Sequence, residues 1–293
     1  MVTPLKGQDE LDVTGLKKLI EHLIKGGVHG IFILGTTGEA QSLSYHLRYE
    51  LVERTIQQVD GQVPVLVGIS DTSFVESLKL ARHADQYGAS AVVATPPYYY
   101  LSNQNELFHY FLSLADNSPI PLFLYNMPSH AKVNISVETV LKLSKHKNII
   151  GLKDSSGDLL YFQEVVRVLK KKEDFSILIG PEEMLMQCML TGGHGGVNGG
   201  ANMFPKLYVE MFKASIDRDL DRMNILQDII LRISSNIYTI GNSGGGYLPG
   251  LKTALSLLGI CKNVMALPYS AFGNKEKREI QEKLDLMNLE EWI

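Results

Sequence analysis

Short apolar runs alternate with amphipathic segments over roughly the first 214 residues, and this alternation constrains the fold more than any other feature. Continuous runs of this length are typical of strands that are buried on both faces of a parallel sheet. The runs lie at residues 31–34, 65–67, 91–94, 122–124, 149–152 and 177–179, with a weaker run at 195–197. Val2 and Thr3 are candidates to end an eighth strand at the start of the chain.

The segments between the runs carry helical patterns, with apolar residues on one face. Helices are expected at residues 14–25, 44–59, 74–87, 103–117, 137–144, 159–171 and 182–190. Strands that alternate with helices predict a parallel sheet with helical crossovers, which leaves a closed barrel and a doubly wound open sheet. Eight units of this length favour an α/β fold of the (β/α)8 TIM-barrel type, whose usual size is ~250 residues.

The strand signals stop after Ala214, and three further helices are expected at residues 217–236, 251–258 and 275–288. A glycine-rich loop at 241–246 joins two of them. We therefore predict a barrel with the active site at 1–216 and a C-terminal helical extension at 217–293.

Composition excludes several classes of protein. The net charge is −4 with no basic block, so we expect no nucleic-acid partner, and no apolar stretch is long enough to span a membrane. The N-terminus lacks the features of a signal peptide, which predicts a cytoplasmic protein. Cys188 and Cys261 fit a reducing compartment, and Cys188 is expected in a helical core. His130 and His194 lack further ligands at metal spacing, so no metal is expected.

Lys153 is the most informative residue of the chain. It directly follows the run at 149–152, and a barrel places its active site at the C-terminal ends of its strands. Gly151 lies on the same face of the strand and is expected to leave space beneath the lysine. Burial disfavours a charged amine, and a neutral amine is the nucleophile that Schiff-base formation requires. The alternative is a lysine that reaches solvent or pairs with Asp154.

Other strand ends carry polar groups that suit the same chemistry. Tyr125 follows the neighbouring strand and supplies a hydroxyl that can relay protons, although it is equally well explained as a packing residue. Thr36 and Thr37 lie in a glycine-flanked turn where hydroxyls and N–H groups can bind an anion, or they simply form a turn. The tyrosine run at 98–100 is typical of an interface.

Three motifs occur in order along the chain: Gly-Thr-Thr-Gly-Glu at 35–39, Tyr-Asn-Met-Pro at 125–128 and Gly-Leu-Lys-Asp at 151–154. This ordered set resembles the dihydrodipicolinate synthase / N-acetylneuraminate lyase family. The likeness runs over nearly the whole chain, including the helical extension. It implies pyruvate-dependent class I aldolase chemistry without a cofactor.

The resemblance also implies residue roles. Lys153 matches the Schiff-base lysine and Tyr125 the proton-relaying tyrosine. Thr36 and Thr37 match the pair that binds the 2-oxo acid carboxylate. Tyr99 matches a tyrosine that reaches into the neighbouring subunit's site, as family members are usually homotetramers built from dimers. Val197 matches a backbone position beside bound pyruvate.

The chain departs from the family pattern at three positions. The synthases place an arginine after Tyr-Asn-x-Pro-Ser to hold the aldehyde's carboxylate, where this chain has His130. The sialic acid lyases carry an acidic pair where Glu182 and Glu183 stand, but their serine near strand eight is replaced here by Gly199. The stretch that contains Ser155 is more similar to sugar-acid aldolases.

The sequence therefore predicts an enzyme that forms a Schiff base between Lys153 and pyruvate or a larger 2-oxo acid, with an aldehyde as second substrate. A 2-keto-3-deoxy sugar acid is the expected substrate, bound in part by His130, Glu182 and Ser155. The enzymatic alternative is dihydrodipicolinate synthase, which condenses pyruvate with aspartate semialdehyde. A non-catalytic sensor of 2-oxo acids is a remote alternative. The predicted assembly is a homotetramer or homodimer.

Overall fold

The computed structural model describes residues 1–241 and 246–293, which form two compact units. One unit comprises residues 65–198, and the other comprises residues 1–64 together with 199–293. The division at residue 216 between barrel and extension stays a prediction. Residues 242–245 of the expected glycine-rich loop lie outside the described part of the chain.

Six parallel strands form the sheet of the unit at 65–198, and each pairs with the next along the chain. They are β4 (Val65–Gly68), β5 (Ala91–Ala94), β6 (Leu122–Asn126), β7 (Ile149–Asp154), β8 (Ser176–Ile179) and β9 (Gly195–Gly196). Every residue of β5 and β6 is buried, as the continuous apolar runs predicted. In the register of β6 and β7, Tyr125 pairs with Lys153.

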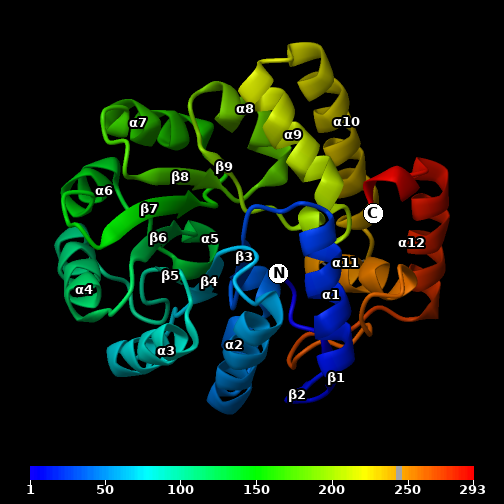
Figure 1. Cartoon of the computed structure of the whole chain (residues 1–293), viewed down its shortest axis with the longest axis horizontal. Helices are drawn as coiled ribbons and strands as arrows, with labels where there is room; N and C mark the ends of the chain where they lie inside the picture. The colour runs from blue at the N-terminus through cyan, green and yellow to red at the C-terminus, as the bar shows by residue number, and fades with distance from the viewer. Residues whose placement is uncertain (242–245) are drawn as a thin grey trace. The chain divides into compact units, whose positions relative to one another are not determined.

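Helices α3, α4, α6 and α7 lie on the outer side of these strands (Figure 1). The helices of this unit are α3 (Phe74–Tyr87), α4 (Gln104–Asn117), α5 (Pro128–Ala131), α6 (Val137–Leu143), α7 (Leu159–Leu169) and α8 (Leu185–Leu190), with a 3₁₀ turn η3 (Glu182–Met184) before α8. Polar side chains cap the N-termini of α3, α4, α6 and α7, among them Asn103, which forms a capping box with Glu106. Cys188 is buried in α8, as predicted, and burial raises the pKa of its thiol to about 12.

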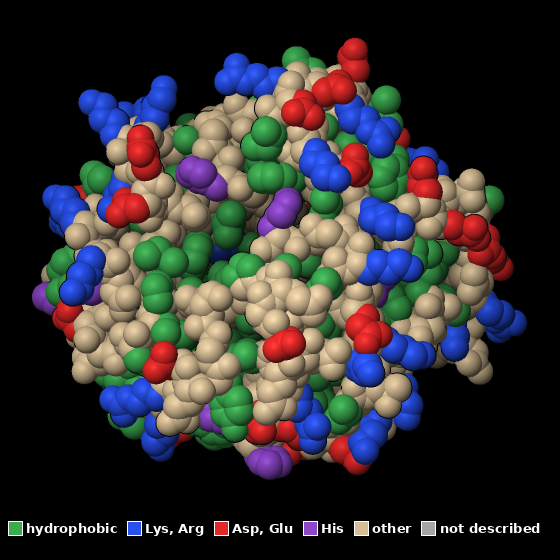
Figure 2. Space-filling model, in the orientation of Figure 1, with side chains coloured by type: hydrophobic (Ala, Val, Ile, Leu, Met, Phe, Trp, Pro, Cys, Tyr) green, Lys and Arg blue, Asp and Glu red, His purple; other side chains and the backbone are tan. Residues whose placement is uncertain are grey.

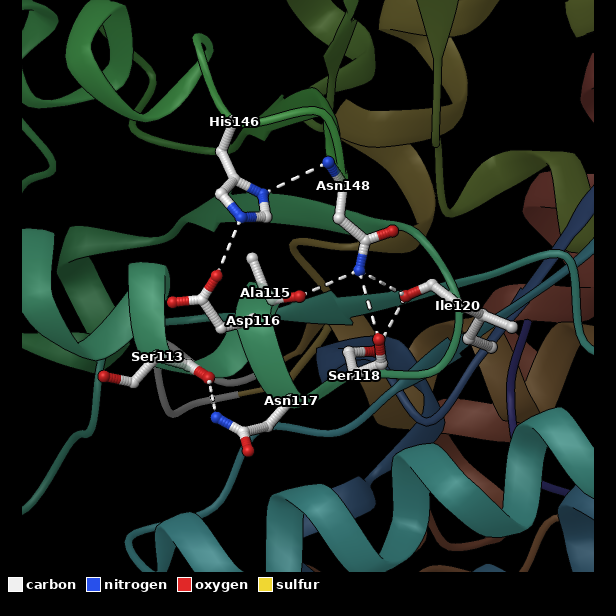
Figure 3. A network of polar contacts seen from close by, with 8 residues as sticks. All are labelled: Ser113, Ala115, Asp116, Asn117, Ser118, Ile120, His146 and Asn148. Atoms are coloured by element: carbon white, nitrogen blue, oxygen red, sulfur yellow. Dashed lines mark hydrogen bonds and ion pairs between the residues drawn. The ribbon is translucent and has the colours of Figure 1, made fainter.

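A polar network lies at the N-terminal ends of β6 and β7 (Figure 3). Asn148, directly before β7, donates its side-chain amide to three backbone carbonyls, those of Ala115, Ser118 and Ile120. The Nε2 atom of His146 lies 3.0 Å from Asp116 Oδ1, and its Nδ1 accepts the backbone N–H of Asn148. These contacts link the end of α4 and the loop after it to the start of β7. They lie at the N-terminal ends of the strands, where residues of a barrel usually contribute to stability.

The other unit begins with a two-stranded antiparallel ribbon of β1 (Leu5–Gly7) and β2 (Glu10–Leu11). The expectation that Val2 and Thr3 end a strand is wrong. The N–H of Val2 donates to Asn202 Oδ1 at 2.9 Å, and the hydroxyl of Thr3 donates to the carbonyl of Gly38. Pro4 has no N–H to donate to a neighbouring strand. Val2 and Thr3 therefore bond to a side chain and a loop carbonyl instead of to a second strand.

The remaining elements of this unit are mostly helical. They are α1 (Val13–Lys25), β3 (Ile31–Ile33), the 3₁₀ turns η1 (Thr36–Gly38) and η2 (Ala40–Ser42), α2 (Tyr45–Val59), η4 (Gly200–Asn202), α9 (Pro205–Asp217), α10 (Leu220–Ile237), α11 (Tyr247–Leu257), α12 (Asn274–Met287) and η5 (Glu290–Trp292). Helix α9 packs against α10, and α11 against α12. Helices α5 and α9 were not predicted from the sequence, and each has a proline in its first turn, where proline is well tolerated.

Both signs of charge are interspersed over the face of the molecule in Figure 2, without a large patch of either sign. Interspersed charges of both signs are typical of a surface in contact with solvent. Within residues 1–241 and 246–293, the structure has no helix that is both long and apolar enough to cross a bilayer.

Candidate active site

Lys153 and Tyr125 lie side by side at the ends of β7 and β6. The Nζ atom of Lys153 is 4.2 Å from the centroid of the Tyr125 ring. Both residues are buried, with 8% and 3% of their surfaces exposed. The contact follows from the register of the two strands, which aligns the residues directly. An amine enclosed against an aromatic ring, with a phenol on the same residue, can support both nucleophilic attack and proton transfer.

The space over Gly151 is filled by a neighbouring side chain. A Cβ atom at this position would lie 2.2 Å from Cε1 of Phe123 and 2.7 Å from the carbonyl oxygen of Ser176. We expected Gly151 to leave room beneath Lys153, but the room is occupied by the Phe123 ring. The glycine therefore lets β6 and β7 pack closely, one layer below the paired Tyr125 and Lys153.

A buried polar network fixes the ends of the same two strands. The amide of Asn126 donates to Asp154 Oδ1 at 2.8 Å, and its Oδ1 accepts the N–H of Ile135. The hydroxyl and N–H of Ser156 both donate to Asp154. Burial raises the pKa of Asp154, and the hydrogen bonds from Asn126 and Ser156 oppose the rise. This network restrains the backbone on the C-terminal side of Lys153.

Three of the predicted substrate-binding residues lie in the loops after β7, β8 and β9. The N–H of Ser155 donates to the carbonyl of Asn126, and its side chain packs where a Cβ of Gly180 would stand. Glu182 is buried at the start of η3. Val197 is half-buried, and its N–H donates to the carbonyl of Ile179 at 2.8 Å. The parallel order of β7, β8 and β9 brings these loops to one edge of the sheet.

Tyr99 and His130 are more exposed than the other predicted site residues in this unit. Tyr99 is 79% exposed and contacts the ring of Tyr100, which is 80% exposed. His130 lies at the end of α5, with its Nδ1 atom 3.0 Å from Ser129 Oγ. Partial desolvation and then the charge of Lys132 lower the pKa of His130, so its imidazole is neutral at pH 7 to 8.

Thr36 and Thr37 form the 3₁₀ turn η1 in the other unit. Leu34 and Glu39, on either side of this turn, both have φ of +56°, a conformation that costs free energy in residues other than glycine. Strained backbone of this kind persists only where surrounding contacts determine it. One such contact links the hydroxyls of Thr37 and Tyr247, whose oxygen atoms are 3.0 Å apart.

Glu39 provides the second contact that holds this turn. Its carboxylate forms a buried ion pair with Lys252 of α11 and accepts the N–H of Ala266. Lys252 also donates to the carbonyl of Val264 at 2.7 Å. Lys252 and Tyr247 were not among the predicted residues. No local sequence pattern marks them, because both contacts join segments about 210 residues apart.

Comparisons with known proteins identify the family. Residues 1–287 match the model of the dihydrodipicolinate synthetase family. The chain belongs to this family. Two relatives in it are the 4-hydroxy-tetrahydrodipicolinate synthases of Gluconacetobacter diazotrophicus and Thermodesulfovibrio yellowstonii, which are 30% and 32% identical. In both cases the match covers 97% of this chain, and 94% and 95% of the relative.

Solved structures of the dihydrodipicolinate synthetase family match the fold. A dihydrodipicolinate synthase from Bacteroides thetaiotaomicron is 51% identical with a TM-score of 0.95, over 98% of this chain and 96% of that one. YagE of E. coli K12, solved in complex with pyruvate, is 29% identical with a TM-score of 0.92, again over 98% and 96%. These matches confirm the (β/α)8 fold class with C-terminal helices.

Membership of the dihydrodipicolinate synthetase family makes the chain a carbon–carbon lyase of the pyruvate-dependent class I aldolase type. The alternative of a non-catalytic sensor is thereby set aside. The relatives' names also favour the enzymatic alternative, the synthase, over the expected cleavage of a 2-keto-3-deoxy sugar acid.

Proposed function

We propose that this protein is a 4-hydroxy-tetrahydrodipicolinate synthase, which condenses pyruvate with aspartate semialdehyde. The observation that carries the proposal is the buried amine of Lys153 against the Tyr125 ring. The choice of substrates comes from the relatives. One of them, a dihydrodipicolinate synthase of solved structure, is 51% identical to this chain.

The proposed reaction begins with attack of the neutral Lys153 amine on the ketone carbon of pyruvate. Loss of water gives an imine, which acts as an electron sink for the neighbouring methyl carbon. Tyr125 relays a proton from that carbon, and the resulting enamine adds to the aldehyde carbon. The amine of aspartate semialdehyde then attacks the imine carbon, which closes a ring and frees Lys153.

The other predicted residues take roles in binding. Thr36 and Thr37 hold the carboxylate of pyruvate, and the backbone at Val197 lies beside it. Tyr99 completes the site of a second subunit in a homodimer or homotetramer, a role that fits its 79% exposure. Ser155 and Glu182 accept or donate hydrogen bonds to the aldehyde substrate. We place this chemistry in the cytoplasm and without a cofactor.

His130 favours a second candidate function, the cleavage of a 2-keto-3-deoxy sugar acid to pyruvate and an aldehyde. A neutral imidazole binds a carboxylate less strongly than an arginine does, because it lacks the charge and the two-pronged geometry. Hydroxyl groups of a sugar acid suit a neutral imidazole and the buried carboxyl of Glu182 better.

A direct comparison of substrates tests the two candidates. The kcat/KM for pyruvate with aspartate semialdehyde is measured beside pyruvate release from a series of 2-keto-3-deoxy sugar acids. We expect the condensation to be faster than every cleavage. Cleavage of one sugar acid well above the condensation rate would overturn the synthase proposal in favour of the second candidate.

A further inference from the structure

Tyr247 lies at the first residue of α11, far along the chain from the turn that it contacts. Its hydroxyl oxygen is 3.0 Å from Oγ1 of Thr37, within hydrogen-bond distance. Its ring packs edge-to-face on Tyr238, with centroids 4.8 Å apart. The ring thus packs on the residue directly after α10, while the hydroxyl reaches the turn of Thr37.

Gly199 makes room for this hydroxyl. A Cβ atom at position 199 would lie 1.8 Å from the Tyr247 hydroxyl oxygen and 2.8 Å from Cζ. No side chain can stand there while Tyr247 keeps its place. The Tyr247 hydroxyl can therefore occupy its position only because residue 199 has no side chain.

We infer that Tyr247 is a positioning residue for the 2-oxo acid carboxylate, and that it acts through Thr37. This inference rests on the proposed function, in which Thr37 binds that carboxylate. A hydroxyl has one proton to donate and can accept from other donors. When Tyr247 donates to Oγ1 of Thr37, the Thr37 proton is directed to the substrate, and the chained hydrogen bonds polarise one another.

The variant Tyr247→Phe tests the inference, because it removes the hydroxyl and keeps the ring. Loss of one neutral hydrogen bond predicts a roughly 3- to 10-fold weaker affinity for pyruvate. The variant is incubated with increasing pyruvate, the Lys153 imine is reduced with borohydride, and the half-saturating pyruvate concentration is determined by mass spectrometry. We expect this concentration and the KM for pyruvate to rise, with kcat within about twofold of the wild type.

Tyr238→Phe is the matched control, since it removes a hydroxyl from the partner ring and preserves the edge-to-face contact. It should leave the half-saturating concentration unchanged. The inference would be overturned if Tyr247→Phe and the wild type had the same half-saturating pyruvate concentration. It would also be overturned if Tyr247→Phe and Tyr238→Phe lost kcat and affinity for pyruvate to the same extent. A wild-type protein that forms no adduct on Lys153 would instead refute the proposed function.

Gly199→Ala supplies an independent test, because its methyl group displaces the Tyr247 hydroxyl from the other side. Alone it should weaken pyruvate binding about as much as Tyr247→Phe. In the double variant the two effects should not add, since both remove the same contact. Additive effects would show that Gly199 and Tyr247 act separately and would contradict the shared arrangement. Thermal unfolding confirms that each variant is folded.

Discussion

The side chains of Glu39 and Lys252 form an ion pair in which neither side chain has solvent-exposed surface. Each group also has a backbone partner, the N–H of Ala266 for Glu39 and the carbonyl of Val264 for Lys252. Burial lowers the pKa of Lys252, and the charge of Glu39 opposes this shift. The pair joins the turn of Thr36 and Thr37 to helix α11, so its loss should affect both stability and substrate binding.

Lys252→Met should destabilise the protein by about 3–5 kcal/mol, because it leaves the Glu39 carboxylate buried and unpaired. Urea unfolding measures the change. The double variant Glu39→Gln, Lys252→Met should recover part of the lost stability, since no buried charge remains. Lys6→Met breaks an exposed pair with Glu10 and should keep the wild-type midpoint. A Lys252→Met midpoint equal to that of Lys6→Met would contradict the role of the buried pair.

Lys153→Arg should abolish the reaction, because a guanidinium remains charged and cannot form an imine. A long side chain that ends in nitrogen is retained beside the Tyr125 ring, so the fold should be preserved. Incubation with pyruvate and borohydride, followed by peptide mapping, should show an adduct on Lys153 in the wild type and none in the variant. An adduct at another lysine in both proteins would refute the assignment of Lys153.

Tyr125→Phe should keep the aromatic contact with Lys153 and lose the proton relay. General acid–base catalysis contributes about 10²- to 10⁴-fold, so kcat should fall within that range. The Lys153 adduct with pyruvate should still form, though more slowly, and stopped-flow mixing followed by reduction measures its rate. A kcat within twofold of the wild type would mean that another group moves the proton.

His130→Arg should improve the synthase reaction. The lowered pKa of His130 leaves it neutral at pH 8, and its protonated fraction increases as the pH falls. The KM for aspartate semialdehyde should therefore decrease from pH 8 toward pH 6 in the wild type. His130→Arg, charged throughout, should lower this KM about 10-fold at pH 8 and remove the pH dependence.

His130→Gln is the matched control for this pH series, since it keeps a hydrogen-bonding side chain that does not titrate. Its KM for aspartate semialdehyde should show no decrease toward pH 6. If the wild type and His130→Gln have the same pH profile, His130 does not bind the aldehyde's carboxylate.

Asn148→Ala should separate stability from catalysis. The variant removes the side-chain donor from carbonyls between the end of α4 and the start of β6 (Figure 3), of which that of Ile120 keeps another donor, the Ser118 hydroxyl, and it should cost about 1–3 kcal/mol in unfolding free energy. Because the network lies at the end of the strands opposite Lys153, kcat at 25 °C should match the wild type. A large loss of kcat in a folded variant would show that the two ends of the sheet are coupled.

The local pattern of the sequence was sufficient to predict most elements of the fold. The apolar runs at 91–94 and 122–124 became β5 and β6, because strands buried on both faces need continuous apolar residues. The cap at Ser44 and the polar start at Asn103 marked helices that begin within a residue of the prediction. The positions of Lys153 and Tyr125 at the ends of neighbouring strands were predicted because strand ends can be identified from local sequence.

Tertiary structure alone decided which distant groups meet. Val2 and Thr3 resemble a strand end, yet their hydrogen bonds go to Asn202 and Gly38. The Phe123 ring, rather than open space, lies over Gly151. Periodicity reports which face of an element is buried, but not what it is buried against. The contact of Thr37 with Tyr247, 210 residues later, exists only because folding brings η1 to the start of α11.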